Sequence, residues 1–330
     1  MLYKKILIAF ASVLFVVLIF FLFNYSTNKP DKDTEYQKSF YKNYKIFALD
    51  IPDSLDFAGE KVAANRFDVR ESIDHELLIN TYWQSQTIMF IKKANRFFPI
   101  VEPILKKYGV PEDFKYLALA ESGFVANTVS PAGATGVWQF MKASALKYGL
   151  EVNENIDERY NIEKETEAAC KLLLEAYKSY HSWTMAAASY NVGMGGLNKQ
   201  VAMQKTSNYY DLYLNSETAR YIYRVISFKI ILSNPKKYGF YLRKRDLYPV
   251  IPTYTVKVDS AITDLVGFAA KYKISYKLLM EFNPWIRTTT LVNVSRKAYN
   301  ITLPKDGSMN YDVLLSDVPD ENIVLPDTLK

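Results

Sequence analysis

The hydrophobic positions of the chain first form one uninterrupted block. Residues 6–23 read ILIAFASVLFVVLIFFLF and contain no charged side chain, which is long enough for a helix that spans a bilayer. Lys4 and Lys5 precede the block and favour a cytoplasmic N-terminus. The pattern predicts a membrane anchor over residues 1–24. A cleaved signal is the alternative, which fits less well because no small-x-small exit follows the block.

The spacing then changes to a helical one. The polar run from Asn24 to about Asp56 predicts a linker with little fixed structure, and we place the linker at residues 25–74, ahead of the helical pattern. From His75 the apolar positions follow a helical period, first in a bracing helix that ends before Pro99 and then in further helices to about Pro235. We therefore predict a mainly α domain over residues 75–246.

A third pattern begins after Leu247. Alternating residues predict a strand at 254–258, two short helices follow, and a second strand is expected near 300–304. This order predicts a separate small α+β module of βααβ type at residues 247–306, with an acidic tail at 307–330.

Charge and cysteine content remove several classes of function. The net charge of +6 is spread along the chain without a long basic run and does not choose between peptidoglycan and nucleic acid as an anionic partner. No nucleic-acid partner is expected, because the sequence has no nucleic-acid-binding motif and the predicted anchor conflicts with that function. The single cysteine, Cys170, excludes a disulfide within the chain and has the apolar neighbours of a core thiol. The two histidines, His75 and His181, are isolated in the sequence, and no metal site or cofactor is expected.

One acidic residue falls on an apolar helix face. Phe114, Leu117, Ala118 and Glu121 are spaced at i, i+3, i+4 and i+7, so Glu121 lies on the face that should be buried, just before Gly123. Burial and the negative end of the helix dipole both disfavour the carboxylate and should raise its pKa. This environment suits a general acid near neutral pH. The alternative is an ordinary glutamate that reaches solvent at the end of its helix.

Four short motifs occur in order around and after this glutamate. They are Glu121-Ser122-Gly123-Phe124, the run GATGVWQFM from Gly133 to Met141, Ser189-Tyr190-Asn191, and Glu217-Thr218-Ala219-Arg220-Tyr221. With these motifs the sequence resembles the soluble-lytic-transglycosylase (SLT) catalytic domain of family 1 lytic transglycosylases, and most closely the membrane-bound murein transglycosylase D type. The resemblance covers residues 95–235. It departs from the family at Ser189, where alanine is usual.

The resemblance implies a lysozyme-like helical fold and cleavage of peptidoglycan. Glu121 would protonate the oxygen of the MurNAc-β-1,4-GlcNAc bond and then, as a carboxylate, accept a proton from the C6 hydroxyl of the same muramic sugar. The product would be a 1,6-anhydro-MurNAc end, with no water consumed. Retaining glycosidases usually need a second carboxylate, whereas this family is thought to use the substrate's N-acetyl oxygen.

The resemblance also implies a set of substrate-binding residues: Ser122, Gly136, Gln139, Met141, Tyr190, Asn191, Glu217 and Tyr221. Tyr190 would orient Glu121 or the N-acetyl group through its hydroxyl. Structural alternatives remain open for four positions. Ser122 can be a polar helix end, Gly133 and Gly136 can serve only the turn, and Glu217 can be the N-terminal acid of its helix. Trp138 is expected in the core.

The small module resembles a LysM domain, a peptidoglycan-binding unit. Its matching features include Tyr254-Thr255-Val256, Asn283-Pro284 and Ile301-Thr302-Leu303-Pro304, whereas Val258-Asp259-Ser260 departs from the usual Gly-Asp-Ser/Thr. A module that binds glycan would raise the effective concentration of the enzyme at the wall. A structural appendage without binding is the alternative.

Together these patterns predict a monomer whose partners are peptidoglycan strands and, through residues 1–24, the inner membrane. The catalytic domain would lie in the periplasm, or the protein would be exported after signal cleavage. A goose-type lysozyme-like muramidase and a non-catalytic peptidoglycan-binding protein are the competing functions.

Overall fold

The computed structural model describes residues 2–27, 34–35, 37–38, 42 and 47–316. The chain divides into two units, residues 1–47 with 325–330 and residues 48–324. In the first unit, helix α1 (Leu2–Thr27) contains a stretch, Tyr3–Phe21, that is long and apolar enough to cross a membrane by length and composition. An uncleaved anchor and a signal sequence both meet this criterion. Much of the predicted linker lies outside the described residues.

The folded part of the second unit begins before the predicted domain boundary. Strands β1 (Asp56–Phe57) and β2 (Glu60–Lys61) form an antiparallel hairpin, and helix α3 already begins at Phe67. Phe57 is fully buried, with its ring centroid 5.4 Å from that of Phe114. Residues 56–74 therefore belong to the helical domain, which corrects the predicted linker. The hairpin has too few apolar residues to show a period.

The helical domain forms one apolar core. Its helices are α3 (Phe67–Tyr82), α4 (Gln84–Tyr108), α5 (Phe114–Ser122), α6 (Lys142–Lys147), α7 (Ile162–Tyr180), α8 (Trp183–Val192), α9 (Met194–Gln204) and α10 (Ser216–Ser233), with 3-10 turns η1 (Glu158–Tyr160), η2 (Tyr209–Asp211), η3 (Pro235–Tyr238) and η4 (Lys244–Asp246). The expected helix end before Pro99 is wrong, because α4 continues through Pro99 and Pro103. A proline removes one helix hydrogen bond, and the buried Val101 and Leu105 favour the continued helix.

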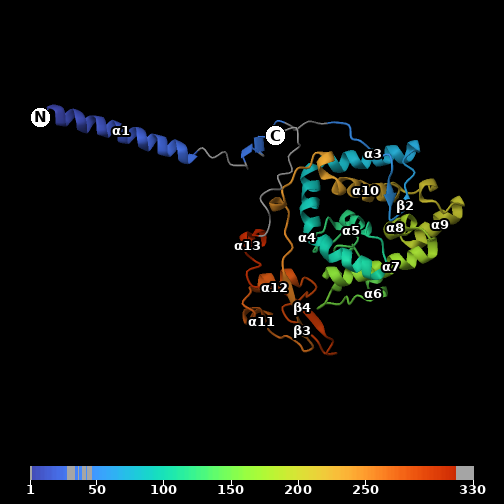
Figure 1. The fold of residues 1–330 in the computed structure, drawn as a ribbon. Helices are drawn as coiled ribbons and strands as arrows, with labels where there is room; N and C mark the ends of the chain where they lie inside the picture. Colours follow the sequence, from blue (N-terminus) through green and yellow to red (C-terminus); the bar gives the residue numbers. More distant parts are fainter. Residues whose placement is uncertain (1, 28–33, 36, 39–41, 43–46, 317–330) are drawn as a thin grey trace. The chain divides into compact units, whose positions relative to one another are not determined.

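Helix α10 is the element that connects the domain's parts. It contacts α3 on one side and α5 and α8 on the other, and Figure 1 shows it running beside α3. Its stripe of Ile222, Val225 and Ile226 is fully buried, as its spacing predicts. Side chains of α10 can therefore reach α3 and the end of α5 at the same time.

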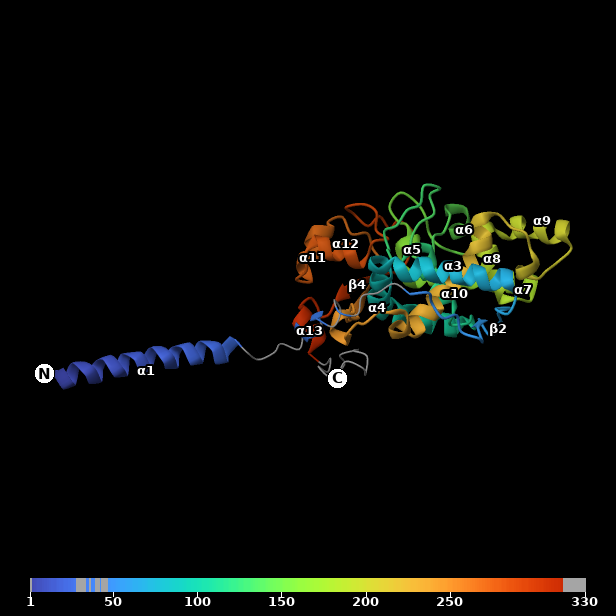
Figure 2. The ribbon, with the colours of Figure 1, turned by 90° about the horizontal axis from the view of Figure 1, so that it is seen from above.

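The small module has the predicted order of elements. Strand β3 (Thr253–Val258) pairs antiparallel with β4 (Tyr299–Pro304), with Val256 opposite Ile301. Between them in the sequence lie α11 (Leu265–Lys271) and α12 (Tyr276–Phe282). Figure 1 draws both helices beside the strand pair, and Figure 2 shows the two helices again from above. A short helix, α13 (Tyr311–Leu315), forms in the predicted tail, and residues 317–330 lie outside the described part.

Candidate active site

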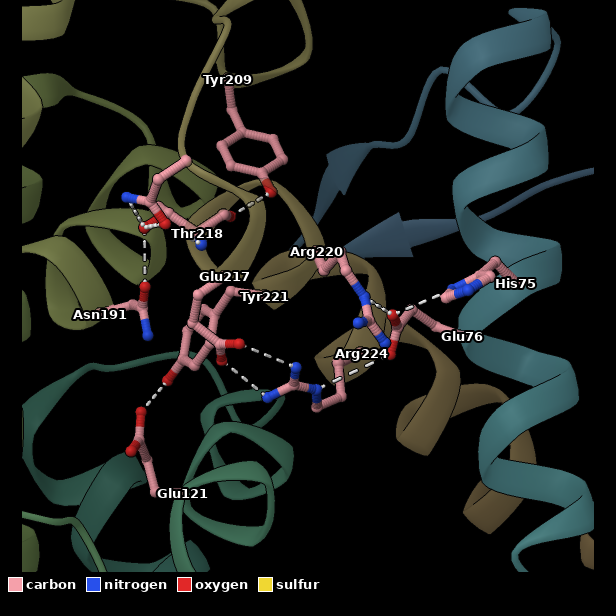
Figure 3. Close-up of polar contacts among 11 residues, drawn as sticks. His75, Glu76, Glu121, Asn191, Tyr209, Glu217, Thr218, Arg220, Tyr221 and Arg224 are labelled. Carbon is pink, nitrogen blue, oxygen red and sulfur yellow. Dashed lines mark hydrogen bonds and ion pairs between the residues drawn. The ribbon is translucent and has the colours of Figure 1, made fainter. Parts of the chain in front are cut away.

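Glu121 lies in the last turn of α5, where the sequence pattern places it. The helix ends at Gly123, whose φ of 58° is left-handed and turns the chain away. Glu121 is half-buried, and the hydroxyl of Tyr221 on α10 donates a hydrogen bond to its Oε1 (Figure 3). Tyr221 itself is only 2% exposed. The carboxyl therefore has one fixed partner that comes from a distant helix.

Burial controls the protonation of this carboxyl. It raises the pKa of Glu121 from the usual 4.5 to about 7, and the nearby charge of Glu217 acts in the same direction. The Tyr221 hydrogen bond and the charge of Arg224 lower the pKa but do not outweigh burial. Glu121 thus keeps a substantial protonated fraction near pH 7, in agreement with the expected upward shift.

Glu217 is occupied by an ion pair with Arg224. Its carboxylate accepts hydrogen bonds from Arg224 at 3.0 and 3.4 Å, and its side chain is 58% exposed. It lies in the first turn of α10, which agrees with the structural alternative for this residue. Its exposure also leaves it accessible to a bound ligand.

A buried glutamate that the sequence reasoning missed completes the network. Glu76 on α3 is 1% exposed, pairs with Arg220 at 2.6 Å and lies 3.7 Å from Arg224 (Figure 3). Arg224 therefore stands between Glu76 and Glu217, with Tyr221 on the same helix. The two arginines four residues apart were the available signal, but nothing in the local sequence pairs them with a residue about 145 positions earlier.

A buried glutamate of α7 binds the backbone of the loop from Gly133 to Met141. Glu165 is fully buried, and its carboxyl accepts backbone hydrogen bonds from Val137 and Trp138, both at 2.8 Å. Gly136 has a φ of 89°, and a Cβ there would lie 1.9 Å from the Arg159 carbonyl oxygen. Gly136 therefore allows a close approach within the protein. Gly133 also has a positive φ, but no atom would meet a Cβ there, which fits a turn residue.

Gln139 and Tyr190 are engaged with this loop in the described structure. Gln139 Nε2 donates to the Gly136 carbonyl at 2.7 Å, and the Tyr190 hydroxyl donates to the Trp138 carbonyl at 2.7 Å. The Tyr190 hydroxyl thus holds the loop, whereas the hydroxyl that contacts Glu121 belongs to Tyr221. The alternative role of Tyr190, a contact with the N-acetyl group of the substrate, stays a prediction. Glu121 and Tyr190 are still close enough for the carboxylate charge to raise the pKa of Tyr190, after the larger effect of burial.

The remaining predicted site residues have mixed roles. Ser122 accepts a hydrogen bond from the Phe124 amide at 3.1 Å, as a polar helix end would. Asn191 accepts one from the Thr218 hydroxyl at 2.8 Å and so links α8 to α10. Met141 is 46% exposed and available to a ligand. Trp138 is fully buried, as expected of a core residue.

Comparisons with known proteins identify the two domains of the chain. Residues 99–213 match the transglycosylase SLT domain, and residues 254–307 match the soluble lytic transglycosylase C-terminal LysM-like domain. The chain is 28% identical over 228 residues to membrane-bound lytic murein transglycosylase D of Escherichia coli strain K12, which is 68% of this chain and 49% of that protein. The chain therefore spans about half the length of this relative.

A second relative is more distant. A putative tributyltin chloride resistance protein of Alteromonas sp. strain M-1 is 25% identical over 122 residues, 37% of this chain and 59% of that protein. The two domain matches confirm both resemblances seen in the motifs. This chain carries a transglycosylase SLT domain followed by a LysM-like domain.

Proposed function

We propose that this protein is a lytic transglycosylase that cleaves the MurNAc-β-1,4-GlcNAc bond of peptidoglycan and leaves 1,6-anhydro-MurNAc ends. The observation that carries the proposal is the environment of Glu121, whose pKa is raised to about 7 by burial while the Tyr221 hydroxyl holds its carboxyl. The matched SLT domain and the murein transglycosylase relative support the same activity.

Glu121 acts twice in the proposed reaction. It first donates its proton to the glycosidic oxygen, so that the GlcNAc side leaves as an alcohol and the muramic C1 becomes electron-poor. The N-acetyl oxygen of the substrate stabilises that centre. The Glu121 carboxylate then accepts the proton of the C6 hydroxyl as its oxygen bonds to C1. A pKa near 7 suits both steps, because a group poised near the working pH donates and accepts with similar ease.

Tyr221 assists the intermediate stage. Its hydrogen bond lowers the pKa of Glu121, so it stabilises the carboxylate that exists between the two proton transfers. The buried Tyr221 cannot rotate freely, because it is packed in the apolar core of the helical domain. We assign it as the residue that orients the acid.

Digestion of purified sacculi tests the proposal. Mass spectrometry of the fragments should show anhydro-muramic ends, whereas a goose-type muramidase would give reducing ends and a non-catalytic binding protein would release nothing. Glu121→Gln should abolish release, and Glu71→Gln, at an exposed glutamate of the same domain, is the matched control. Normal cutting by Glu121→Gln would refute the site.

The proposed location is the cell envelope, with residues 1–24 as an inner-membrane anchor and the catalytic domain in the periplasm. The apolar stretch Tyr3–Phe21 and the membrane-bound relative support it. Fractionation of cells followed by intact-mass analysis distinguishes an uncleaved anchor from an exported, processed protein.

A further inference from the structure

The LysM-like module is joined to the helical domain by backbone hydrogen bonds. Ile156 pairs with Ile286 in an antiparallel bridge. Asp157 N donates to the Trp285 carbonyl at 2.9 Å, and Arg287 N donates to the Asn155 carbonyl at 2.8 Å. The segment 151–160 of the helical domain thus continues, as a short ladder, into the α12–β4 loop of the module.

Side chains strengthen this junction. Ile156 and Ile286 are each 1% exposed and belong to the core of the module. The Arg287 guanidinium lies 4.1 Å from the ring centroid of Tyr160. Lys297 forms an ion pair with Glu151 at 2.6 Å. An apolar core shared across the boundary makes the module a fixed part of residues 48–324 and unlike a domain on a flexible tether.

The same segment reaches the active-site loop on its other side. The Asp157 carboxylate binds Arg159 at 2.7 and 2.9 Å, and both side chains are nearly buried. Arg159 Nη1 donates to the carbonyls of Gly133 and Phe140, each at 3.2 Å. Its guanidinium therefore bridges the two ends of loop 133–140.

Loop 133–140 contains groups that the proposed site needs. It carries Gln139, and its Trp138 carbonyl accepts a hydrogen bond from the hydroxyl of Tyr190. A continuous chain of contacts therefore runs from the module through Asp157 and Arg159 to this loop. Cutting the ladder would leave the Asp157 amide and the Asn155 carbonyl without their partners, which is unfavourable for buried backbone groups.

We propose that Arg159 is a positioning residue of the active site, and that the LysM-like module sets the geometry of loop 133–140 by ordering segment 151–160. In this proposal the module affects kcat, in addition to any binding of the peptidoglycan wall. The kinetic part of this inference rests on the proposed transglycosylase function, whereas the structural coupling does not.

Variants of the full chain test the role of Arg159. On a short soluble glycan that is too small to gain from a second binding module, Arg159→Ala and Asp157→Asn should lower kcat on the order of tenfold or more with a smaller change in KM, since misplaced catalytic groups reduce turnover steeply. Arg159→Lys should recover part of kcat, because it can still donate to one carbonyl. Lys147→Ala, which breaks an exposed ion pair with Glu175, is the matched control. Unchanged kcat in Arg159→Ala would overturn the proposal.

Hydrogen exchange in the full chain tests the role of the module. Ile286→Asp, and the milder Arg287→Ala, should speed amide exchange in residues 151–160 and also in 133–140, whereas Val266→Asp on the exposed face of α11 should change neither. Faster exchange confined to the module, with loop 133–140 unaffected, would overturn the coupling. If the unmodified protein releases no glycan at all, the proposed function fails, and the exchange result still decides the coupling.

Discussion

The raised pKa of Glu121 has a consequence for stability that can be measured without any substrate. A carboxyl whose pKa is higher in the folded state favours folding in its protonated form. That contribution is fully present below pH 4.5 and is lost as the pH rises through about 7. Glu121→Gln carries no charge, and its side-chain oxygen can still accept the Tyr221 hydrogen bond, so this loss should be absent in the variant.

The magnitude follows from the shift. A rise from 4.5 to about 7, at about 1.4 kcal/mol for each pKa unit, corresponds to about 3 kcal/mol. Below pH 4.5 the variant and the wild type should have similar free energies of unfolding. At pH 8 the variant should be more stable by up to about 3 kcal/mol, because the wild type must then hold a charged carboxylate in a desolvated position.

Urea unfolding followed by circular dichroism at pH 4.5, 6 and 8 measures the difference directly. Glu71→Gln is the control, because it removes an exposed carboxyl from the same domain. A difference between Glu121→Gln and wild type that stays constant across this range would refute the reasoning, since the effect must follow the ionisation of one group.

Three further predictions concern the same site. Tyr221→Phe removes a hydrogen bond that lowers the pKa of Glu121, so the alkaline limb of kcat/KM, set by loss of the acid's proton, should move to higher pH; a pH profile on soluble glycan checks it, and a shift to lower pH contradicts it. Arg224→Met removes a positive charge and leaves Glu217 without its ion pair, and both changes raise the pKa of Glu121. The alkaline limb of kcat/KM should therefore also move to higher pH in Arg224→Met, whereas the distant Lys237→Met should leave this limb in place. Gly136→Ala places a Cβ 1.9 Å from a backbone oxygen and should lower stability by about 2 kcal/mol or more in urea unfolding, whereas Gly133→Ala, which has open space, should cost less.

Local patterns predicted the parts of the site that lie close together in sequence. The apolar face of Phe114 to Glu121 placed the proposed acid on a buried face, and the family resemblance of the motifs named Tyr221, which contacts it. The βααβ order of the module also followed from alternation and helical period. These features depend on residues that lie a few positions apart, and the spacing of such residues is visible in the hydrophobic pattern of the sequence.

Features that depend on distant partners could not be predicted in this way. Glu76 meets Arg220 across 144 positions, and whether Tyr190 or Tyr221 reaches Glu121 depends on how α8 and α10 pack. Helix α4 continues through Pro99 because of tertiary burial, which overrides the local cost of proline. The local pattern of a sequence says little about contacts between residues that are distant along the chain.

The placement of α10 determines which boundaries an expression fragment of this protein should have. The recognisable SLT region ends at residue 213, before Tyr221, and begins at residue 99, after both Glu76 and the Phe57 hairpin. A clone trimmed to those limits would keep Glu121 but discard the hydroxyl that holds it. The shortest expression fragment that preserves the acid's surroundings starts ahead of Asp56 and runs past Ser233, and the Trp285–Arg287 contacts favour extending it through the second domain.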